Sequence, residues 1–286
     1  MSLLHVIILA VVQGLAELLP ISSSAHVIVA EKLMGMDPAA PETTLLLVML
    51  HTGTMFAVIV YFWRRWRRAF FQNRLDRKNF AIALILAVIL TATVGGVVTE
   101  GIEKVLLRHQ PHAWVEQLFD RLDLIASALA TVGVLILTAG LLTQRTEPPP
   151  PGAEMTPGQA MWIGAVQGLS LPFRGFSRSG ATISTAMLAG VAKMRAEDFS
   201  FALAVVLTPA AIAREGWRVL ESQRGHLGPL MPSVTSSLYG ALFAFLAGLL
   251  ALKWLSRWLE EGRWYWFGVY CLIFALAVAF LYRSGY

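Results

Sequence analysis

Two short polar segments interrupt a chain that is otherwise strongly apolar. Residues 12–26 and 166–182 both begin with Val-Gln-Gly-Leu, contain a proline and continue into a serine-rich stretch. The first holds a carboxylate, three consecutive serines and a histidine, and the second holds an arginine between two serines. Charged and strongly polar side chains are costly at apolar depth, so they mark a functional site by default.

The first segment places Gln13 and Glu17 four residues apart, which puts both side chains on one face of a helix. Two oxygen-bearing side chains on one face suit a hard divalent cation, Mg²⁺ or Ca²⁺, that also holds a phosphate. A purely structural ion pair between Glu17 and an arginine is the alternative, and the two roles are compatible.

Three serines, Ser22, Ser23 and Ser24, follow Pro20 and precede an expected helix, so they occupy its N-cap and first turn. A helix N-terminus binds phosphate through its free N–H groups and the positive end of its dipole. His26 follows Ser23 by three residues, and a serine within reach of a histidine is the minimum requirement for an activated nucleophile. Serine runs usually cap helices, so the spacing alone leaves capping and catalysis open.

The second segment brings Ser177, Arg178, Ser179 and Gly180 to the start of another expected helix. The fork-shaped, permanently charged guanidinium of arginine matches phosphate oxygens better than any other side chain. The alternative for Arg178 is an ion pair with Glu17. Two serine-rich helix starts with one acid and one arginine describe a phosphate or pyrophosphate site.

Two further polar residues are candidates for lining the same cavity. His51 stands in an apolar run, where a core histidine with its hydrogen bonds satisfied is an equal alternative. Gln167 repeats the position of Gln13 in the second segment.

The composition defines an integral membrane protein. Of 286 residues, 56% are hydrophobic and 14% charged, whereas soluble domains carry about 25% charged residues. The single cysteine, Cys271, excludes a disulfide framework and a cysteine-based metal site. The net charge of +5 does not imply nucleic acid, because much of it lies in 64–78, directly after an apolar run. That placement is a positive-inside signal and favours contact with anionic membrane lipid. Residues 1–19 lack a signal peptide's basic start and cleavage site, so we expect them to be retained.

Six apolar runs are long enough to span a membrane, which predicts an all-α fold with six transmembrane helices. They cover 42–62, 80–98, 122–142, 197–216, 234–253 and 264–283. Four prolines at 148–151 form a linker that cannot be helical, and they divide a single membrane domain into halves 1–146 and 153–286. Each half has three runs, an odd number, so the halves enter the membrane from opposite faces. Matching motifs in oppositely oriented halves constitute an inverted repeat.

Each polar segment joins two helical stretches too short to span, 3–19 with 22–34 and 158–171 with 178–192. We expect two re-entrant helix–turn–helix pairs, with a cavity where their turns meet, since irregular backbone at membrane depth must be buried or line water. The basic loops 63–79 and 254–263 are expected to be cytoplasmic, which places both termini and the first segment on the periplasmic side.

The two patterns resemble the signature motifs of the undecaprenyl-diphosphate phosphatase, or bacitracin-resistance, family. They are Gln-x-x-x-Glu-x-x-Pro-x-Ser-Ser-Ser-x-His at 13–26 and Gly-Phe-Ser-Arg-Ser-Gly-Ala-Thr-Ile-Ser at 175–184. Residues 199–205 and the spacing of the apolar runs also fit the family. The resemblance implies a bacterial inner-membrane hydrolase that converts undecaprenyl diphosphate into undecaprenyl phosphate and inorganic phosphate. It further implies a periplasm-facing site, a divalent cation, recycling of the lipid carrier for cell-wall synthesis, and bacitracin resistance.

Carried onto this sequence, the family motifs imply catalytic roles for Ser23, His26, Glu17 and Arg178, with the cation on Glu17 and Gln13. Phosphate binding then falls to the remaining polar residues of the two segments: Ser22, Ser24, Ser177, Ser179, Gly180 and Arg174. The chain departs from the family pattern at Arg174, which stands where a proline usually precedes the glycine, while Pro172 lies two residues earlier. This departure changes the turn and adds a second cation near the phosphates.

Two other functions share part of this pattern. A lipid or anion transporter would share the paired re-entrant turns and the arginine, but would need no nucleophile. A type-2 phosphatidic acid phosphatase expects a histidine and an acid after the Ser-Arg motif, and the next histidine is His226, so that class is rejected. The sequence leaves open whether the chain forms a homodimer and whether it also flips its lipid product.

Overall fold

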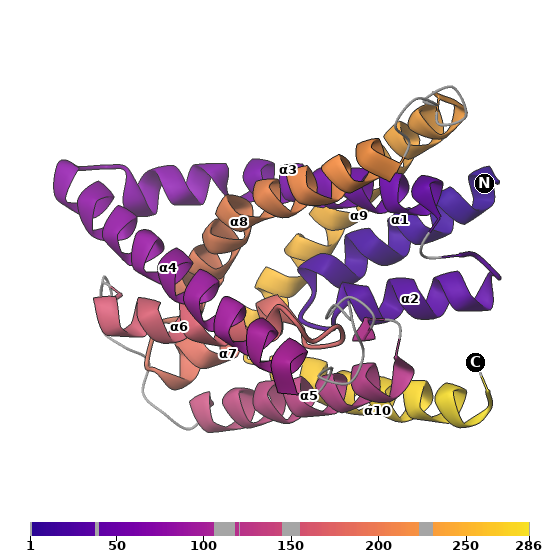
Figure 1. Cartoon of the computed structure of the whole chain (residues 1–286). Coiled ribbons are helices and arrows are strands. Elements are labelled where there is room, and N and C mark those ends of the chain that lie inside the picture. The colour runs from indigo at the N-terminus through magenta and orange to yellow at the C-terminus, as the bar shows by residue number, and fades with distance from the viewer. Residues whose placement is uncertain are drawn as a thin grey trace. The chain divides into compact units, whose positions relative to one another are not determined.

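The computed structural model describes residues 2–37, 40–105, 118–119, 121–144, 155–222 and 231–285, and the proline linker at 148–151 lies outside them. The regular structure of these residues is α-helical (Figure 1). The helices are α1 (Leu3–Leu18), α2 (Ser23–Leu33), α3 (Pro41–Phe70), α4 (Arg74–Val105), α5 (Leu122–Thr143), α6 (Pro157–Ser170), α7 (Arg178–Leu188), α8 (Lys193–Ser222), α9 (Met231–Glu260) and α10 (Tyr265–Arg283). Six of them, α3, α4, α5, α8, α9 and α10, are long and apolar enough to cross a membrane. The prediction of an all-α protein with six such helices is confirmed.

The long helices extend beyond the predicted apolar runs. The connection between α3 and α4 is residues 71–73, not 63–79, and the one between α9 and α10 is 261–264, not 254–263. Arginine and lysine are good helix formers, so the basic segments continue the helices instead of ending them. The 30 residues of α3 span about 45 Å, which exceeds a hydrocarbon core of about 30 Å. The basic ends of such helices therefore project beyond the hydrocarbon.

Four helices are too short to span. They are α1, α2, α6 and α7, with 16, 11, 14 and 11 residues, whereas about 20 residues cross a membrane. Each pair is interrupted at the predicted proline, since α1 ends before Pro20 and α6 ends before Pro172. A proline lacks the N–H that would continue the helical hydrogen bonds.

The chain forms two compact units. One consists of Met1–Leu19, Ser23–Trp63 and Ala204–Leu255, and the other of Pro20–Ser22, Arg64–Leu203 and Ser256–Tyr286. We call them the α1 unit and the α7 unit. Helices α3, α8 and α9 contribute residues to both, and the three-residue turn Pro20–Ser22 of the first polar segment belongs to the α7 unit.

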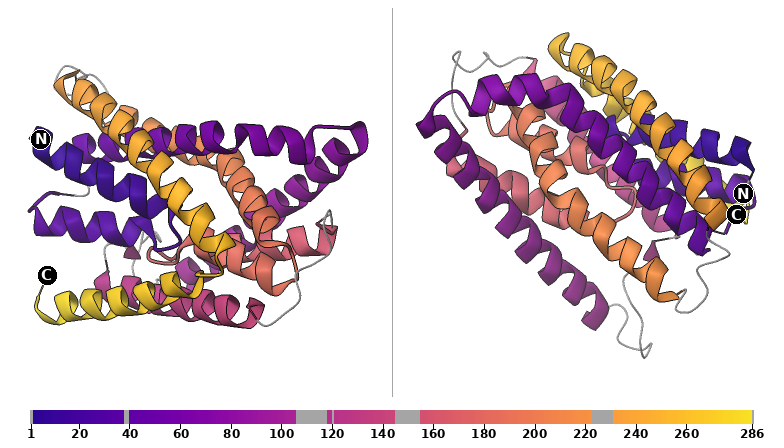
Figure 2. Two further views of the ribbon diagram at one scale, coloured as in Figure 1. Left: turned by 180° about the vertical axis from the view of Figure 1, so that it is seen from behind. Right: turned by 90° about the horizontal axis from the view of Figure 1, so that it is seen from above.

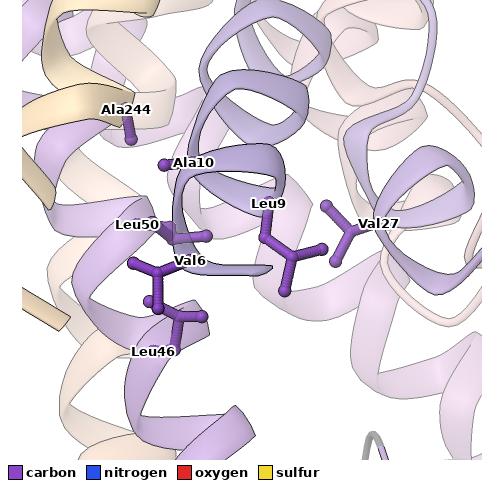
Figure 3. Packing of buried hydrophobic residues seen from close by; sticks show 7 residues of the cluster. All are labelled: Val6, Leu9, Ala10, Val27, Leu46, Leu50 and Ala244. Carbon is purple, nitrogen blue, oxygen red and sulfur yellow. The ribbon is translucent and has the colours of Figure 1, made fainter. Parts of the chain in front are cut away.

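The core of the α1 unit fixes helix α1 against its neighbours. Residues from α1, α2, α3 and α9 form one buried cluster (Figure 3): Val6, Leu9, Ala10, Val27, Leu46, Leu50 and Ala244. Glycines let the backbones approach closely: a Cβ on Gly14 would lie 2.7 Å from the Ala244 carbonyl oxygen, and one on Gly53 would lie 2.2 Å from that of Ala241. Such close contacts at small residues are the main way helices pack in membranes.

Helices of the α7 unit also pack closely at glycines. Helices α5 and α10 run side by side (Figure 2, left), and a Cβ on Gly268 would lie 2.5 Å from the Leu137 backbone nitrogen. Helix α6 packs on α4, where a Cβ on Gly164 would lie 2.3 Å from the Ala87 carbonyl oxygen. The Thr91 hydroxyl also donates to the Gly164 carbonyl at 3.0 Å. Helix α6 thereby holds the second polar segment in place.

A buried charge cluster joins α3, α8 and α9 within the α7 unit. The guanidinium of Arg65 contacts Glu197 at 2.9 Å and Asp198 at 3.0 Å, and the side chains of these two acids are only 1% and 6% exposed. The Ser256 hydroxyl donates to Glu197 at 2.6 Å. The sequence analysis had treated Arg65 as one of several loop cations, whereas it is the counterion of two buried carboxylates.

Replacing Arg65 with Met should destabilise the protein strongly, because it leaves two buried carboxylates without their counterion. We expect a loss of about 3–5 kcal/mol in the free energy of unfolding, measured by circular dichroism during denaturation in detergent micelles. Arg67→Met is the control: this arginine is exposed on the same helix, and its loss should change stability by less than about 0.5 kcal/mol.

Adding Glu197→Gln and Asp198→Asn to Arg65→Met should recover part of the lost stability, since the uncompensated charges are then removed. Equal effects of the Arg65 and Arg67 substitutions would show that the two buried carboxylates do not depend on Arg65 as their counterion.

Candidate active site

A serine and a carboxylate face each other across the break in the first polar segment. Glu17 lies at the end of α1, Ser23 is the first residue of α2, and the Ser23 hydroxyl donates a hydrogen bond to Glu17 Oε2. The Ser23 residue is buried, and the Glu17 side chain is 16% exposed. A hydroxyl that is hydrogen-bonded to a base is the arrangement of an activated nucleophile.

Two other predicted residues converge on the same carboxylate oxygen. Gln13 Nε2 donates to Glu17 Oε2 at 3.3 Å, and His51 Nε2 lies 3.9 Å from that oxygen. The other ring nitrogen of His51, Nδ1, lies 2.8 Å from the carbonyl oxygen of Leu47. A carbonyl only accepts hydrogen bonds, so Nδ1 carries a proton and Nε2 is the nitrogen that faces the carboxylate.

Two more predicted site residues of the first segment lie on α2. Ser24 and His26 are half-buried, and His26 follows Ser23 on the same helix. The hydrogen bond of the Ser23 hydroxyl goes to Glu17 and not to His26. The structure therefore pairs the candidate nucleophile with the carboxylate.

The turn before Ser23 has an unusual backbone. Ser22 has φ 69°, the only positive φ of a non-glycine residue in the described ranges, and this conformation costs about 1–3 kcal/mol. The turn is buried, and its Pro20 carbonyl accepts a hydrogen bond from the Cys271 thiol on α10, with a sulfur–oxygen distance of 3.5 Å. Strained backbone of this kind occurs preferentially at functional sites.

The second polar segment builds a helix start suited to an anion. Ser177 caps α7, and its hydroxyl accepts the backbone N–H of Gly180 at 3.2 Å. The first N–H groups of a helix have no partner within it, and its positive dipole end attracts negative charge. Arg178 and Ser179, both half-buried, occupy this first turn.

The turn before α7 is held by packing on α5. Gly175 has φ 98°, and a Cβ there would lie 2.6 Å from the Ile125 carbonyl oxygen, so a side chain is excluded on both grounds. Arg174 places its guanidinium 4.7 Å from the ring centroid of Phe119. This cation–π contact keeps the positive charge while fixing the side chain.

The turn Pro20–Ser22 meets the second polar segment within the α7 unit. A Cβ on Gly180 would lie 3.2 Å from the carbonyl oxygen of Pro20. The turn that leads directly into Ser23 therefore touches the first turn of α7.

Several side chains that the sequence did not single out form hydrogen bonds that hold α7 in place. The hydroxyls of Thr182 and Ser200 are hydrogen-bonded to each other, and Trp264 Nε1 donates to the Ser184 hydroxyl at 3.0 Å. Gln167, in contrast, was a predicted cavity residue, and it is buried on α6. Serine and threonine are too common in helices for sequence alone to identify these contacts, although Thr182 and Ser184 fall inside the second motif.

The fold defines a multi-pass helical membrane protein, with a serine–carboxylate pair in the α1 unit and an arginine-bearing helix start in the α7 unit. The family described as bacitracin resistance protein BacA matches residues 6–277, and the chain belongs to this family.

Named relatives resemble the chain over almost its whole length. Undecaprenyl-diphosphatase 2 of Acinetobacter baylyi is 53% identical over 279 residues, which is 96% of each chain. Undecaprenyl-diphosphatase 2 of Burkholderia thailandensis is 34% identical, over 96% of this chain and 95% of its own. Undecaprenyl-diphosphatase of Rhodopirellula baltica is 33% identical over 98% of each.

Gly180→Ala should separate the two segments, because the added methyl group meets Pro20, Ser177 and Ile136 atoms at 2.7–3.2 Å. We expect a loss of about 1–3 kcal/mol in the free energy of unfolding. We also expect faster labelling of Cys271, the only cysteine, by a thiol reagent, since its partner Pro20 would be displaced.

The matched control is Gly216→Ala on α8, where a Cβ meets nothing within 4 Å. Alanine should there be neutral or stabilising by up to about 1 kcal/mol. Unchanged Cys271 labelling in Gly180→Ala would contradict the contact between Pro20 and α7.

Proposed function

We propose that the chain hydrolyses undecaprenyl diphosphate to undecaprenyl phosphate and inorganic phosphate, as the names of its relatives state for them. The observation that carries this proposal is the hydrogen bond from the Ser23 hydroxyl to Glu17 at the start of α2. A transporter of the same lipid would need binding groups but no hydroxyl joined to a base. The activity would recycle the lipid carrier for cell-wall synthesis, and membership of a family described as bacitracin resistance protein suggests that it confers that resistance.

The proposed mechanism begins with attack of Ser23 Oγ on the terminal phosphorus. Glu17 takes the hydroxyl proton, the new oxygen–phosphorus bond forms, and the anhydride bond breaks to release undecaprenyl phosphate. Water then hydrolyses the phosphoserine, giving inorganic phosphate and restoring the hydroxyl. We assign His26, within one turn of Ser23, to proton transfer in these steps.

Binding of the phosphates is assigned to the second segment and the flanking serines. Arg178 would bind two phosphate oxygens with its fork, and the positive dipole end at the start of α7 would attract the remaining negative charge. Ser22, Ser24, Ser179 and Arg174 are the additional proposed phosphate ligands.

A divalent cation fits the first segment. Glu17 and Gln13 offer hard oxygen donors one helical turn apart, joined by a hydrogen bond of 3.3 Å. In the described part of the chain, no three or more His, Cys, Asp and Glu side chains gather around a common point. A cation such as Mg²⁺, which is commonly held by one or two carboxylates together with substrate phosphates and water, suits a donor set of this size. When bound, it would neutralise developing charge on the phosphate oxygens.

We also propose that halves 1–146 and 153–286 are inverted repeats with two re-entrant pairs. The helices of the first half have 16, 11, 30, 32 and 22 residues, and those of the second have 14, 11, 30, 30 and 19. Both halves therefore have two short helices, then two long ones, then one of intermediate length.

Helix packing supports the same proposal. Helix α1 contacts α9 and helix α6 contacts α4, so the first helix of each half packs on the fourth helix of the other. Helices α5 and α10, the fifth of each half, pack on one another, with Gly133 near Leu272 and Gly140 near Tyr265. Because residue numbers rise on one helix as they fall on the other, α5 and α10 are antiparallel. Oppositely directed equivalent helices are what an inverted repeat requires.

The proposed orientation follows from the basic helix ends. Arginines and lysines at the end of α3 and the start of α4 favour the cytoplasmic side. The break in the first segment then opens toward the periplasm of a bacterial inner membrane.

Ser23→Ala tests the nucleophile. If Ser23 attacks phosphorus, we expect release of inorganic phosphate from undecaprenyl diphosphate by the purified protein to fall by about 10³-fold or more, while diphosphate binding persists. If Ser23 only caps α2, the loss should be about 1 kcal/mol of stability with little change in turnover. His26→Ala should resemble Ser23→Ala, and the double variant should be scarcely worse, because residues acting as a unit are non-additive.

The control for this series is Ser127→Ala, since the exposed Ser127 hydroxyl bonds only to its own helix, at Asp123 O. Losses that multiply in the double variant would instead indicate a water activated at Glu17 as the attacking group. Phosphate release that is absent in the wild type, with and without a chelator, would overturn the proposed activity.

Arg178→Lys should reduce kcat/KM by about 10²–10³-fold although the charge is kept, because a lysine cannot hold two phosphate oxygens in one plane. Phosphate release measured beside Arg257→Lys provides the comparison, since the Arg257 side chain is 78% exposed and pairs with Glu261. Near-normal turnover of Arg178→Lys would show that this arginine is structural.

A further inference from the structure

A pocket in the α7 unit is lined by no residue of either polar segment. It has a volume of about 200 Å³ and lies among the end of α3, the start of α4, the first turns of α8 and Met155. Sites for drug-sized ligands occupy about 300–1,000 Å³, so this pocket fits a small group rather than a whole lipid or nucleotide.

The walls of the pocket combine aromatic rings with an arginine. Phe70 and Phe80 are stacked with ring centroids 3.9 Å apart, and Phe199 meets Phe80 edge-on at 6.1 Å. The guanidinium of Arg195 lies 5.2 Å from the Phe70 ring centroid and donates one hydrogen bond, at 3.2 Å, to the Ala69 carbonyl. A guanidinium has five N–H donors, so the pocket wall presents a preorganised fork for an oxyanion.

A carboxylate and an amide complete the polar lining. Asp76, in the first turn of α4, accepts a hydrogen bond of 2.7 Å from the Asn73 side chain, which fixes its position. Asn79 lines the pocket one turn further along α4. A site with one cation, one anion and aromatic faces is complementary to a zwitterion: its anionic part meets Arg195, and its cationic part meets Asp76 and a ring face.

The pocket lies where apolar helices give way to charge. Its α3 and α4 residues flank the connection 71–73, and both helices are long and apolar enough to cross a membrane. The surrounding helix ends expose six cations: Arg64, Arg67, Arg68, Arg74, Arg77 and Lys78. Such a boundary marks the depth of lipid headgroups. Phe71 and Leu75, which are 49% and 64% exposed, provide apolar surface beside it.

We propose that this pocket binds the headgroup of a zwitterionic phospholipid, one that carries a phosphodiester and an ammonium group as phosphatidylethanolamine does. The phosphate occupies the Arg195 and Asn79 side of the pocket, and the ammonium group occupies the side of Asp76 and the phenylalanine rings. The acyl chains run along the apolar surface of α3 and α4. The proposal concerns a site separate from the serine–carboxylate pair and is independent of the phosphatase activity.

The test measures lipid binding by the delipidated full chain in detergent, by native mass spectrometry with added phosphatidylethanolamine or phosphatidylglycerol. We expect the wild type to retain phosphatidylethanolamine more tightly. Arg195→Gln should weaken binding of both lipids by about tenfold or more, the loss expected for a charge-assisted hydrogen-bonded contact. Asp76→Asn keeps a side-chain oxygen for the start of α4 and should weaken only phosphatidylethanolamine.

Arg67→Gln is the matched control, because Arg67 is an exposed cation of α3 that does not line the pocket. Arg195→Lys keeps the positive charge beside Phe70 but removes the planar fork of N–H donors. It should therefore also bind phosphatidylethanolamine more weakly, in a protein that retains its packing. Equal losses of lipid binding for Arg67→Gln and Arg195→Gln would contradict the proposed site. Equal binding of both lipids, unaffected by Asp76→Asn, would do the same. Either result would show that lipid is held by general surface charge and not by this pocket.

Discussion

Every break in a helix at apolar depth releases backbone donors and acceptors that water cannot reach, and each must find a partner in the protein. The carbonyl of Pro20 is satisfied by the thiol of Cys271, and the amide of Gly180 by the hydroxyl of Ser177. Partners so close to the backbone require tightly packed neighbours, which explains the glycines where helices touch. The helix breaks therefore require the close packing around them. The reactive side chains lie at these breaks.

Buried charges in the α7 unit must likewise find partners inside the protein. Arg65 lies among exposed arginines of α3 but turns inward to two buried acids of α8. A buried carboxylate pair with one counterion is seldom a net gain in stability over an apolar core, although removing the counterion is severe. Within the α7 unit, the cluster ties together α3, α8 and α9 through Arg65, Glu197 and Ser256.

The sequence predicted the helical class, the six long helices and both break points, because apolar run length and proline are strong local signals. It misplaced the helix ends, since arginine-rich segments such as 64–68 are compatible with helix as well as loop. It paired Ser23 with His26 through spacing, whereas the hydroxyl bonds to Glu17 across the break. The roles of Arg65 and Cys271 depend on residues more than a hundred positions away, which no local pattern encodes.

The backbone of Ser22 has a consequence for how this protein can change. Glycine would adopt φ 69° without penalty, so a single substitution at this position could raise the stability of the fold. A serine in a conformation that favours glycine lowers the stability of the fold, and in return its hydroxyl is held in a fixed position. Stabilised variants of this chain obtained by directed evolution should therefore accumulate glycine at position 22, and their activity would reveal what the hydroxyl contributes.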